Sequence, residues 1–118
     1  MKRIFAFCTL IMLLFTLCAC SDNVVKGSIV KESADGNAEL DIMPQKLLEQ
    51  ANIGDIVVVT VGDFKKEMIF TDEPIEQDGT LQLLLDRSEW SLSICIYNEN
   101  FCREYDIEIK EKVRIYTK

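Results

Sequence analysis

Apolar and polar residues alternate along most of this chain in short runs that end at turn-forming residues. Successive side chains of a β-strand point to opposite faces, so runs of this kind are typical of strands. Seven of them after residue 23 predict a small, mainly β domain, either a barrel or a sandwich. The predicted strands are Val24–Val30, Ala38–Ile42, Ile56–Val61, Lys65–Phe70, Leu81–Leu85, Trp90–Ile96 and Asp106–Tyr116.

Turn residues and one short helix complete the pattern. Asp35-Gly36-Asn37, Gly62-Asp63 and Asp78-Gly79 tolerate positive φ, so we expect a hairpin at each of the three places. A helix is predicted over Pro44–Ala51, because proline suits the first turn and Asn52 can end the helix in the left-handed conformation. This helix is expected to cap one end of a barrel.

The alternation also predicts which faces are buried. Leu92, Ile94 and Ile96 alternate with small polar residues, which predicts a strand that is solvated on one side. The same pattern holds for the apolar residues of Asp106–Tyr116, whereas Ile56–Val61 is apolar on both faces and is predicted to be a central strand. The polar faces are either a binding surface or a solvated wall.

The first residues have the build of an export signal. Lys2 and Arg3 precede the apolar stretch Ile4–Leu17, and the polar Ser21-Asp22-Asn23 ends the run before it reaches the length of a membrane span. Leu17-Cys18-Ala19-Cys20 resembles the lipobox of bacterial lipoproteins. That resemblance implies that Cys20 is acylated and becomes the first residue of the mature protein. The alternative is a plain secretory signal, with Cys20 an ordinary thiol.

The predicted organisation is therefore a signal peptide over residues 1–19, a lipidated cysteine and short tether over residues 20–23, and one β domain over residues 24–118. After cleavage the chain keeps 11 basic and 20 acidic residues, so nucleic acid and anionic lipid are poor partners. There is no histidine. Neither a zinc site nor a Ser/His or Cys/His catalytic arrangement can be assembled, and we expect no metal, no cofactor and no enzyme activity.

Three segments resemble, in order and spacing, the C-terminal β-barrel domain of the S-adenosylmethionine hydroxide adenosyltransferase family, which also contains SAM-dependent chlorinases and fluorinases. They cover Asp35–Ile42, Ile53–Val59 and Asn100–Ile107, and the similarity extends over nearly all of the mature chain. The resemblance implies a barrel fold. The predicted fold class is accordingly a mainly β, single-domain β-barrel with one short helix.

The resemblance also implies candidate binding residues. In the family the barrel contributes adenine and ribose contacts beside a large N-terminal catalytic domain, and this chain has no counterpart of that domain. Asn37 matches the asparagine of the family's aromatic-Gly-Asn turn, but Asp35 replaces the stacking aromatic residue. Tyr97 and Glu99 replace an asparagine and a glycine of a second motif. Asn37 and Tyr97 are the ligand-binding candidates; alternatively, Asn37 is a left-handed turn residue bonded to local backbone.

Cys95 and Cys102 form a candidate disulfide. If Asn98-Glu99 were a two-residue hairpin turn, the two cysteines would face each other within bridging distance, and an exported protein can meet oxidising conditions. Under the family resemblance, Asn100–Tyr105 is instead a short helical turn, and both cysteines are small buried residues.

Three classes of function follow. The first is a lipid-anchored, non-catalytic module in the bacterial cell envelope, at the outer membrane if the source has two membranes, that binds a nucleoside-like ligand or an extracytoplasmic protein. The second is a structural envelope lipoprotein, and the third is a subunit of an adenosyl-transferring enzyme completed by another chain. The wider candidate binding surface comprises Asn37, Phe64, Phe70, Trp90, Tyr97 and Phe101.

Overall fold

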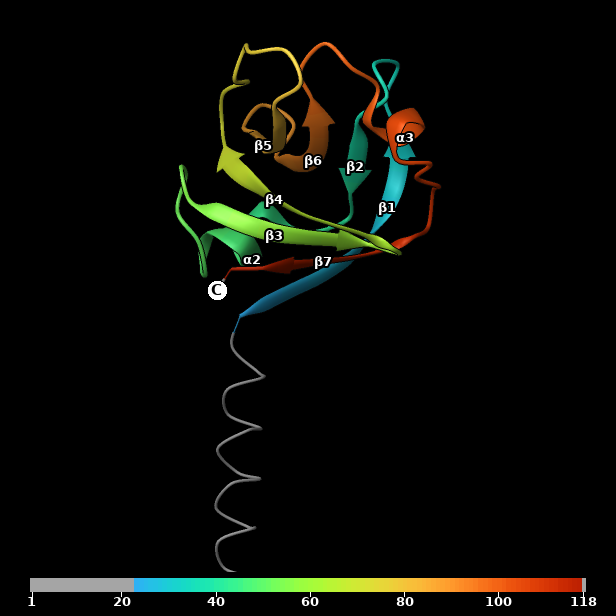
Figure 1. The fold of residues 1–118 in the computed structure, drawn as a ribbon. Helices are drawn as coiled ribbons and strands as arrows, with labels where there is room; N and C mark the ends of the chain where they lie inside the picture. The colour runs from blue at the N-terminus through green and yellow to red at the C-terminus, as the bar shows by residue number, and fades with distance from the viewer. Residues whose placement is uncertain (1–22, 118) are drawn as a thin grey trace, which may run out of the picture.

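The computed structural model describes residues 23–117, which form a closed barrel of seven strands (Figure 1). The predicted signal peptide, Cys20 and most of the polar leader lie outside these residues. Around the barrel the strands follow the order β1-β2-β6-β5-β4-β3-β7. Their bounds are β1 Val24–Glu32, β2 Ala38–Leu40, β3 Ile56–Val61, β4 Phe64–Thr71, β5 Leu81–Asp86, β6 Ser91–Ile96 and β7 Lys112–Tyr116. The mainly β barrel is therefore confirmed.

Two of the three predicted hairpins are present. β1 and β2 pair antiparallel around residues 33–37, and Gly62-Asp63 is a two-residue turn between β3 and β4. The hairpin predicted at Asp78-Gly79 is wrong, because β4 and β5 run parallel, with Ile69–Thr71 beside Gln82–Leu84. Parallel neighbours need a connection that returns along the barrel. The loop 72–80 makes this return outside the barrel wall, and Gly79 supplies positive φ within it.

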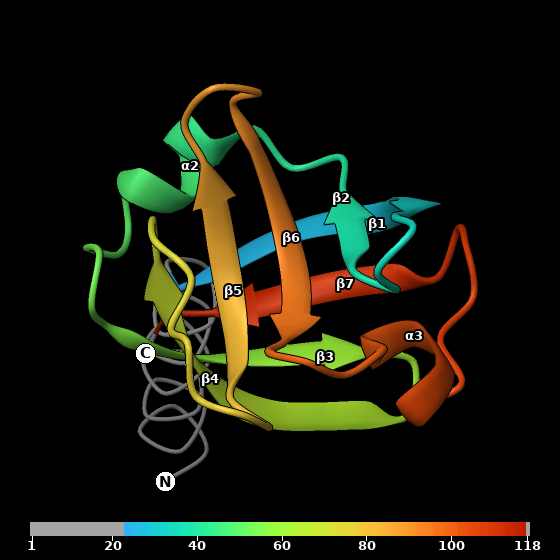
Figure 2. The same ribbon diagram turned by 90° about the horizontal axis from the view of Figure 1, so that it is seen from above.

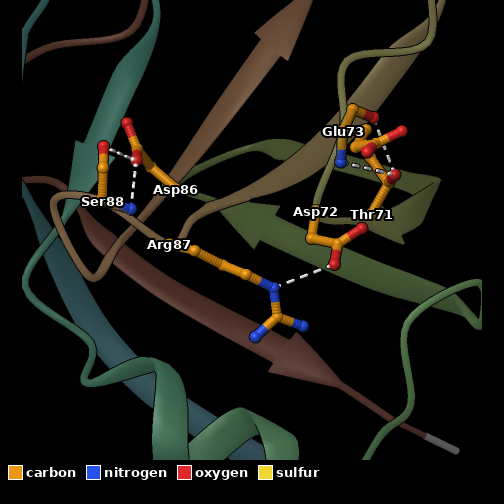
Figure 3. Close-up of polar contacts among 6 residues, drawn as sticks. All are labelled: Thr71, Asp72, Glu73, Asp86, Arg87 and Ser88. Atoms are coloured by element: carbon orange, nitrogen blue, oxygen red, sulfur yellow. Dashed lines mark hydrogen bonds and ion pairs between the residues drawn. The ribbon is translucent and has the colours of Figure 1, made fainter.

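The hairpin that the sequence did not reveal joins β5 to β6 through residues 87–90. The Asp86 carboxylate opens the turn by accepting hydrogen bonds from the Ser88 hydroxyl and from the Ser88 backbone N–H (Figure 3). It also accepts a hydrogen bond from the backbone N–H of Glu89. The Ser88 hydroxyl and these N–H groups lower the pKa of Asp86. Arg87 Nε lies 3.0 Å from Asp72 Oδ2 at the surface, which links this hairpin to the start of the loop 72–80 (Figure 3).

The interior of the barrel is apolar, and the predicted alternation of β6 is correct. Leu92 and Ile94 have no exposed surface, and Ile96 is buried beside them. β3 has a neighbour on each side, β4 and β7, but its outward face is not fully buried, because Ile56 is 58% exposed. The strand predicted from Asp106 begins only at Lys112, because Asp106 and Lys110 adopt positive φ and interrupt the extended backbone.

Two short helices lie on opposite sides of the barrel (Figure 2). The sequence pattern predicted one of them, and the family resemblance implied a helical turn over Asn100–Tyr105 at the place of the other. α2 covers Pro44–Leu48 and inserts Leu47 into the core at one end, as expected from the sequence. It is shorter than predicted, and the positive φ after it belongs to Gly54, not Asn52. α3 covers Phe101–Glu104 and fills the other end with the buried ring of Phe101.

Candidate functional site

A cavity of about 430 Å³ opens on the outer face of the barrel, at the end that carries α3. Cavities of this size fall in the range of small-molecule pockets, about 300–1,000 Å³. Both predicted ligand-binding residues, Asn37 and Tyr97, line it. The complete lining is Asp35 and Asn37 from the β1–β2 hairpin, Pro74 from the loop 72–80, Gln82 and Leu84 from β5, Cys95 and Ile96 from β6, and Tyr97, Asn98, Glu99 and Asn100 after β6.

The other members of the wider candidate surface do not belong to this cavity. Phe64, Phe70 and Phe101 are buried in the core. Phe64 and Phe101 pack edge to face with ring centroids 5.2 Å apart, so they are structural. Trp90 is 41% exposed, but it lies in the β5–β6 hairpin at the other end of the barrel.

The first wall of the cavity is the β1–β2 hairpin. The Asn37 N–H donates to Ser33 Oγ at 3.0 Å, and the Asn37 carbonyl accepts from Ser33 N at 2.9 Å. The positive φ of this turn, 84°, falls on Gly36, so the interpretation of Asn37 as a left-handed turn residue is wrong. Within residues 23–117 the Asn37 side-chain amide has no hydrogen-bond partner. It is therefore free to bond a ligand.

The floor of the cavity depends on a residue that sequence reasoning missed. Gln82 points outward from β5, yet it is only 1% exposed. Its Oε1 accepts from Ile75 N at 2.9 Å, and its Nε2 donates to the carbonyls of Ile75 and Thr80 at 3.3 Å. These bonds hold the loop 72–80 against the barrel. The signal in the sequence was a single amide inside the otherwise apolar run Leu81–Leu85, which by itself does not distinguish a buried position from a solvated one.

The remaining wall is the turn that follows β6. Tyr97 and Asn98 form this turn, and Ile96 and Glu99 bridge across it. Asn98 Nδ2 donates to Asp78 Oδ1 at 2.6 Å, and Asn100 Oδ1 accepts from Arg103 N at 2.8 Å, capping α3. Tyr97 bonds the loop through its backbone, accepting from Gly79 N and donating to Thr80 O. Asn98 and Asn100 thus build the wall, whereas the Tyr97 ring remains half-buried beside the cavity.

Cys95 and Cys102 are both buried, free thiols. The disulfide required a hairpin turn at Asn98-Glu99. That prediction is wrong, because the turn residues are Tyr97 and Asn98, one position earlier. Cys95 lies on the cavity floor and Cys102 lies in α3. Burial raises the pKa of each thiol to about 11, and the charge of Glu32 contributes at Cys102. Neither thiol is a nucleophile at neutral pH, because the thiolate is the reactive form.

The electrostatic character of the cavity is acidic. Asp35 and Glu99 line it, and none of its lining residues is basic. Within the described part of the chain, no three His, Cys, Asp or Glu side chains are placed to hold a metal ion. The arrangement suits non-covalent binding through amide, phenol and carboxylate groups.

Solved structures of two longer proteins share this fold. An uncharacterized conserved protein from Thermotoga maritima matches with a TM-score of 0.70 and 18% identity, over 79% of this chain and 36% of that chain. A conserved hypothetical protein from Thermus thermophilus matches with a TM-score of 0.56 and 17% identity, over 76% of this chain and 34% of that chain. This chain therefore spans about a third of each. No protein-family model and no curated protein sequence matches it.

Gly36 lies at the cavity rim. Its replacement by alanine should lower the free energy of unfolding more than the same replacement at Gly54. A Cβ at Gly36 would overlap the side chain of Asn100, whereas Gly54, also at positive φ, has nothing within 4 Å of an added Cβ. Both alanine variants incur about 1–2 kcal/mol for a left-handed backbone. Gly36→Ala should lose roughly 1 kcal/mol more, because Asn100 must leave its capping position. Urea unfolding of the fragment 21–118, which contains the whole barrel, measures both. Equal losses would contradict the close packing of Gly36 on Asn100.

The two thiols should be protected from alkylation in the folded protein. Because burial raises their pKa from 9.0 to about 11, iodoacetamide should modify them much faster in urea than in buffer at pH 8.

Since the folded pKa lies above the unfolded one, the thiols' contribution to stability is present below pH 9 and is lost as the pH rises toward 11. Mass spectrometry counts the modified residues, and the Cys95→Ala/Cys102→Ala variant should lose less stability over that range. Two unmodifiable cysteines in urea without reductant would reveal a disulfide instead.

Proposed function

We propose that this protein is a lipid-anchored, non-catalytic binding module of the bacterial cell envelope. In this proposal residues 1–19 direct export, acylated Cys20 holds the chain at a membrane, and the barrel binds a small ligand or an extracytoplasmic protein. The observation that carries the proposal is the cavity that joins Asn37 to Tyr97. Asn37 presents an amide with no partner among residues 23–117, and the half-buried Tyr97 lines the same cavity.

The sequence around Cys20 supports the anchor. A single acyl chain holds a protein to a bilayer only marginally, whereas further chains each add about 0.8 kcal/mol per buried methylene. A multiply acylated Cys20 would therefore be a stable anchor. Among the described residues, the helices are too short and too polar to cross a bilayer. If the source has two membranes, Ser21 after the lipidated cysteine is compatible with the outer one.

Binding is favoured over catalysis by the chemistry of the side chains present. The chain has no histidine, and the thiol on the cavity floor is protonated at neutral pH. The amides of Gln82, Asn98 and Asn100 already bond the protein itself. The remaining polar groups of the cavity, on Asp35, Asn37, Tyr97 and Glu99, can recognise a ligand. Among the described residues, no general base stands beside an activated nucleophile.

The resemblance to the C-terminal domain of S-adenosylmethionine hydroxide adenosyltransferases supports a nucleoside-like ligand. Asn37 and Asn100, which begin or belong to the resembling segments, both line the cavity. A second candidate function is that of a barrel subunit completed by another chain. It is favoured by one observation, that the barrel matches about a third of each of two longer proteins. Asp35, where the family stacks an aromatic ring, weakens adenine binding in either case.

A nucleoside in the cavity should stabilise the barrel. We expect adenosine or S-adenosylmethionine, at 100 times its dissociation constant, to add about 2.7 kcal/mol to the unfolding free energy of the fragment 21–118. Thermal unfolding measures the shift, which should disappear in Asn37→Ala. The control Asn52→Ala changes an exposed asparagine outside the cavity and should keep the shift. No saturable shift with either compound would exclude the nucleoside.

Acylation of Cys20 can be tested in a bacterial host that expresses the full chain. Labelled palmitate should enter the wild-type protein and the Cys18→Ala variant, and both should sediment with membranes. Cys20→Ala should take up no label and leave the membrane fraction, because the thiol that forms the thioether is gone. Incorporation of label into Cys20→Ala, or none into the wild-type protein, would contradict the proposed anchor.

A further inference from the structure

We propose that the cavity takes a small organic cation, an amine or a guanidinium group carried on a short alkyl chain. This inference rests on the proposed function, because it names the ligand class of the same cavity. The cavity suits a cation because of the charges and hydrogen-bonding groups of its lining residues. At Asp35 this chain carries a carboxylate where the resembling family has an aromatic residue.

The charge at the rim of the cavity is negative. Asp35 and Glu99 both line it, one from the β1–β2 hairpin and the other from the segment after β6. Within residues 23–117 neither carboxylate forms an ion pair. Arg103 lines a second hollow, which shares Glu99 and Asn100 with the cavity, and Lys31 lies 4.0 Å from Glu39; neither basic side chain lines the cavity itself. A cation in the cavity would be attracted by both carboxylates, whereas an anion would be repelled by both.

The rim carboxylates also have unused acceptor capacity. Asp78 and Asp86, in contrast, are occupied: Asp78 accepts from Asn98, and Asp86 accepts three hydrogen bonds in its own turn. Asp35 and Glu99 accept none from the described residues. Ionised carboxylates are acceptors only, so the complementary ligand must bring donors. Amine and guanidinium groups are donors without acceptors, and their bonds to carboxylates are strengthened by charge.

The cavity floor carries apolar groups beside the amide of Gln82. Leu84 and Cys95 face outward from adjacent strands, and Cys95 is 7% exposed. The Cys95 thiol lines the cavity without a hydrogen-bond partner among the described residues. A neutral thiol behaves as a small hydrophobic group. Such a floor suits methylene groups, while the charged end of the ligand remains at the rim between Asp35 and Glu99.

The experiment is a titration of the ¹⁵N-labelled fragment 21–118 with agmatine, which carries an amine and a guanidinium group on a four-carbon chain. The comparison compound is 4-guanidinobutanoate, which has the guanidinium group but a carboxylate in place of the amine. Agmatine should shift the amide signals of residues 35–37 and 97–100 saturably. The comparison compound should bind at least about fivefold more weakly, the effect expected for one charge pair.

Substitutions then assign the effect to the rim. Asp35→Asn and Glu99→Gln should each weaken agmatine binding about fivefold. Asp63→Asn removes an exposed carboxylate from the β3–β4 turn, outside the cavity, and should leave the affinity unchanged. Shifts spread over all acidic surfaces, an unaffected Asp35→Asn/Glu99→Gln double variant, or no binding of agmatine would each overturn the cation inference.

Uncharged adenosine, titrated in parallel, separates the two proposals. If adenosine shifts the signals of residues 35–37 and 97–100 and agmatine does not, the proposed binding module is supported and the cation inference is overturned. If neither compound shifts these signals, the cation inference fails, and the nucleoside ligand fails with it.

Discussion

The parallel junction between β4 and β5 closes the barrel, and the cavity depends on how that junction is made. Only three residue pairs join the two strands, Ile69–Thr71 with Gln82–Leu84. A parallel neighbour requires the chain to travel back along the wall before the second strand begins. The loop 72–80 makes this return, and the backbone groups that it buries against the barrel need hydrogen-bond partners within the protein. The buried amide of Gln82 supplies partners for Ile75 and Thr80 and so holds the loop as one side of the cavity.

The strands could be predicted because their signals are local. Alternation at β6 and turn residues at Gly62-Asp63 are decided by neighbours in the sequence, and both were correct. The parallel pairing was not predictable in this way, because Asp78-Gly79 has the composition of a hairpin turn although it ends a crossover loop. The early half of the last predicted strand failed for a related reason. Positive φ at Asp106 and Lys110 is adopted without glycine, so the sequence carried no mark of the break.

The candidate site was predictable in part. Asn37 and Tyr97 were singled out through a family resemblance, and the structure brings them to one cavity although sixty residues separate them. Gln82 was missed because its importance lies in bonds to a loop whose path the sequence did not reveal. Cys95 was considered only as half of a disulfide. Its place on the cavity floor follows from its outward direction on β6, where it pairs with Gln82 of β5.

The pairing of the first strand with the last has a consequence for orientation. Val24 at the start of β1 lies opposite Tyr116 at the end of β7, whereas Asp35 and Asn37 follow the far end of β1. That far end of β1 lies beside α3 (Figure 1). From Cys20 to Val24 an extended chain reaches roughly 14 Å. An acyl anchor at Cys20 would thus keep one end of the barrel close to the bilayer surface and turn the mouth of the cavity toward the aqueous side. The barrel would then sample solutes and proteins of the compartment, not lipids of its own membrane.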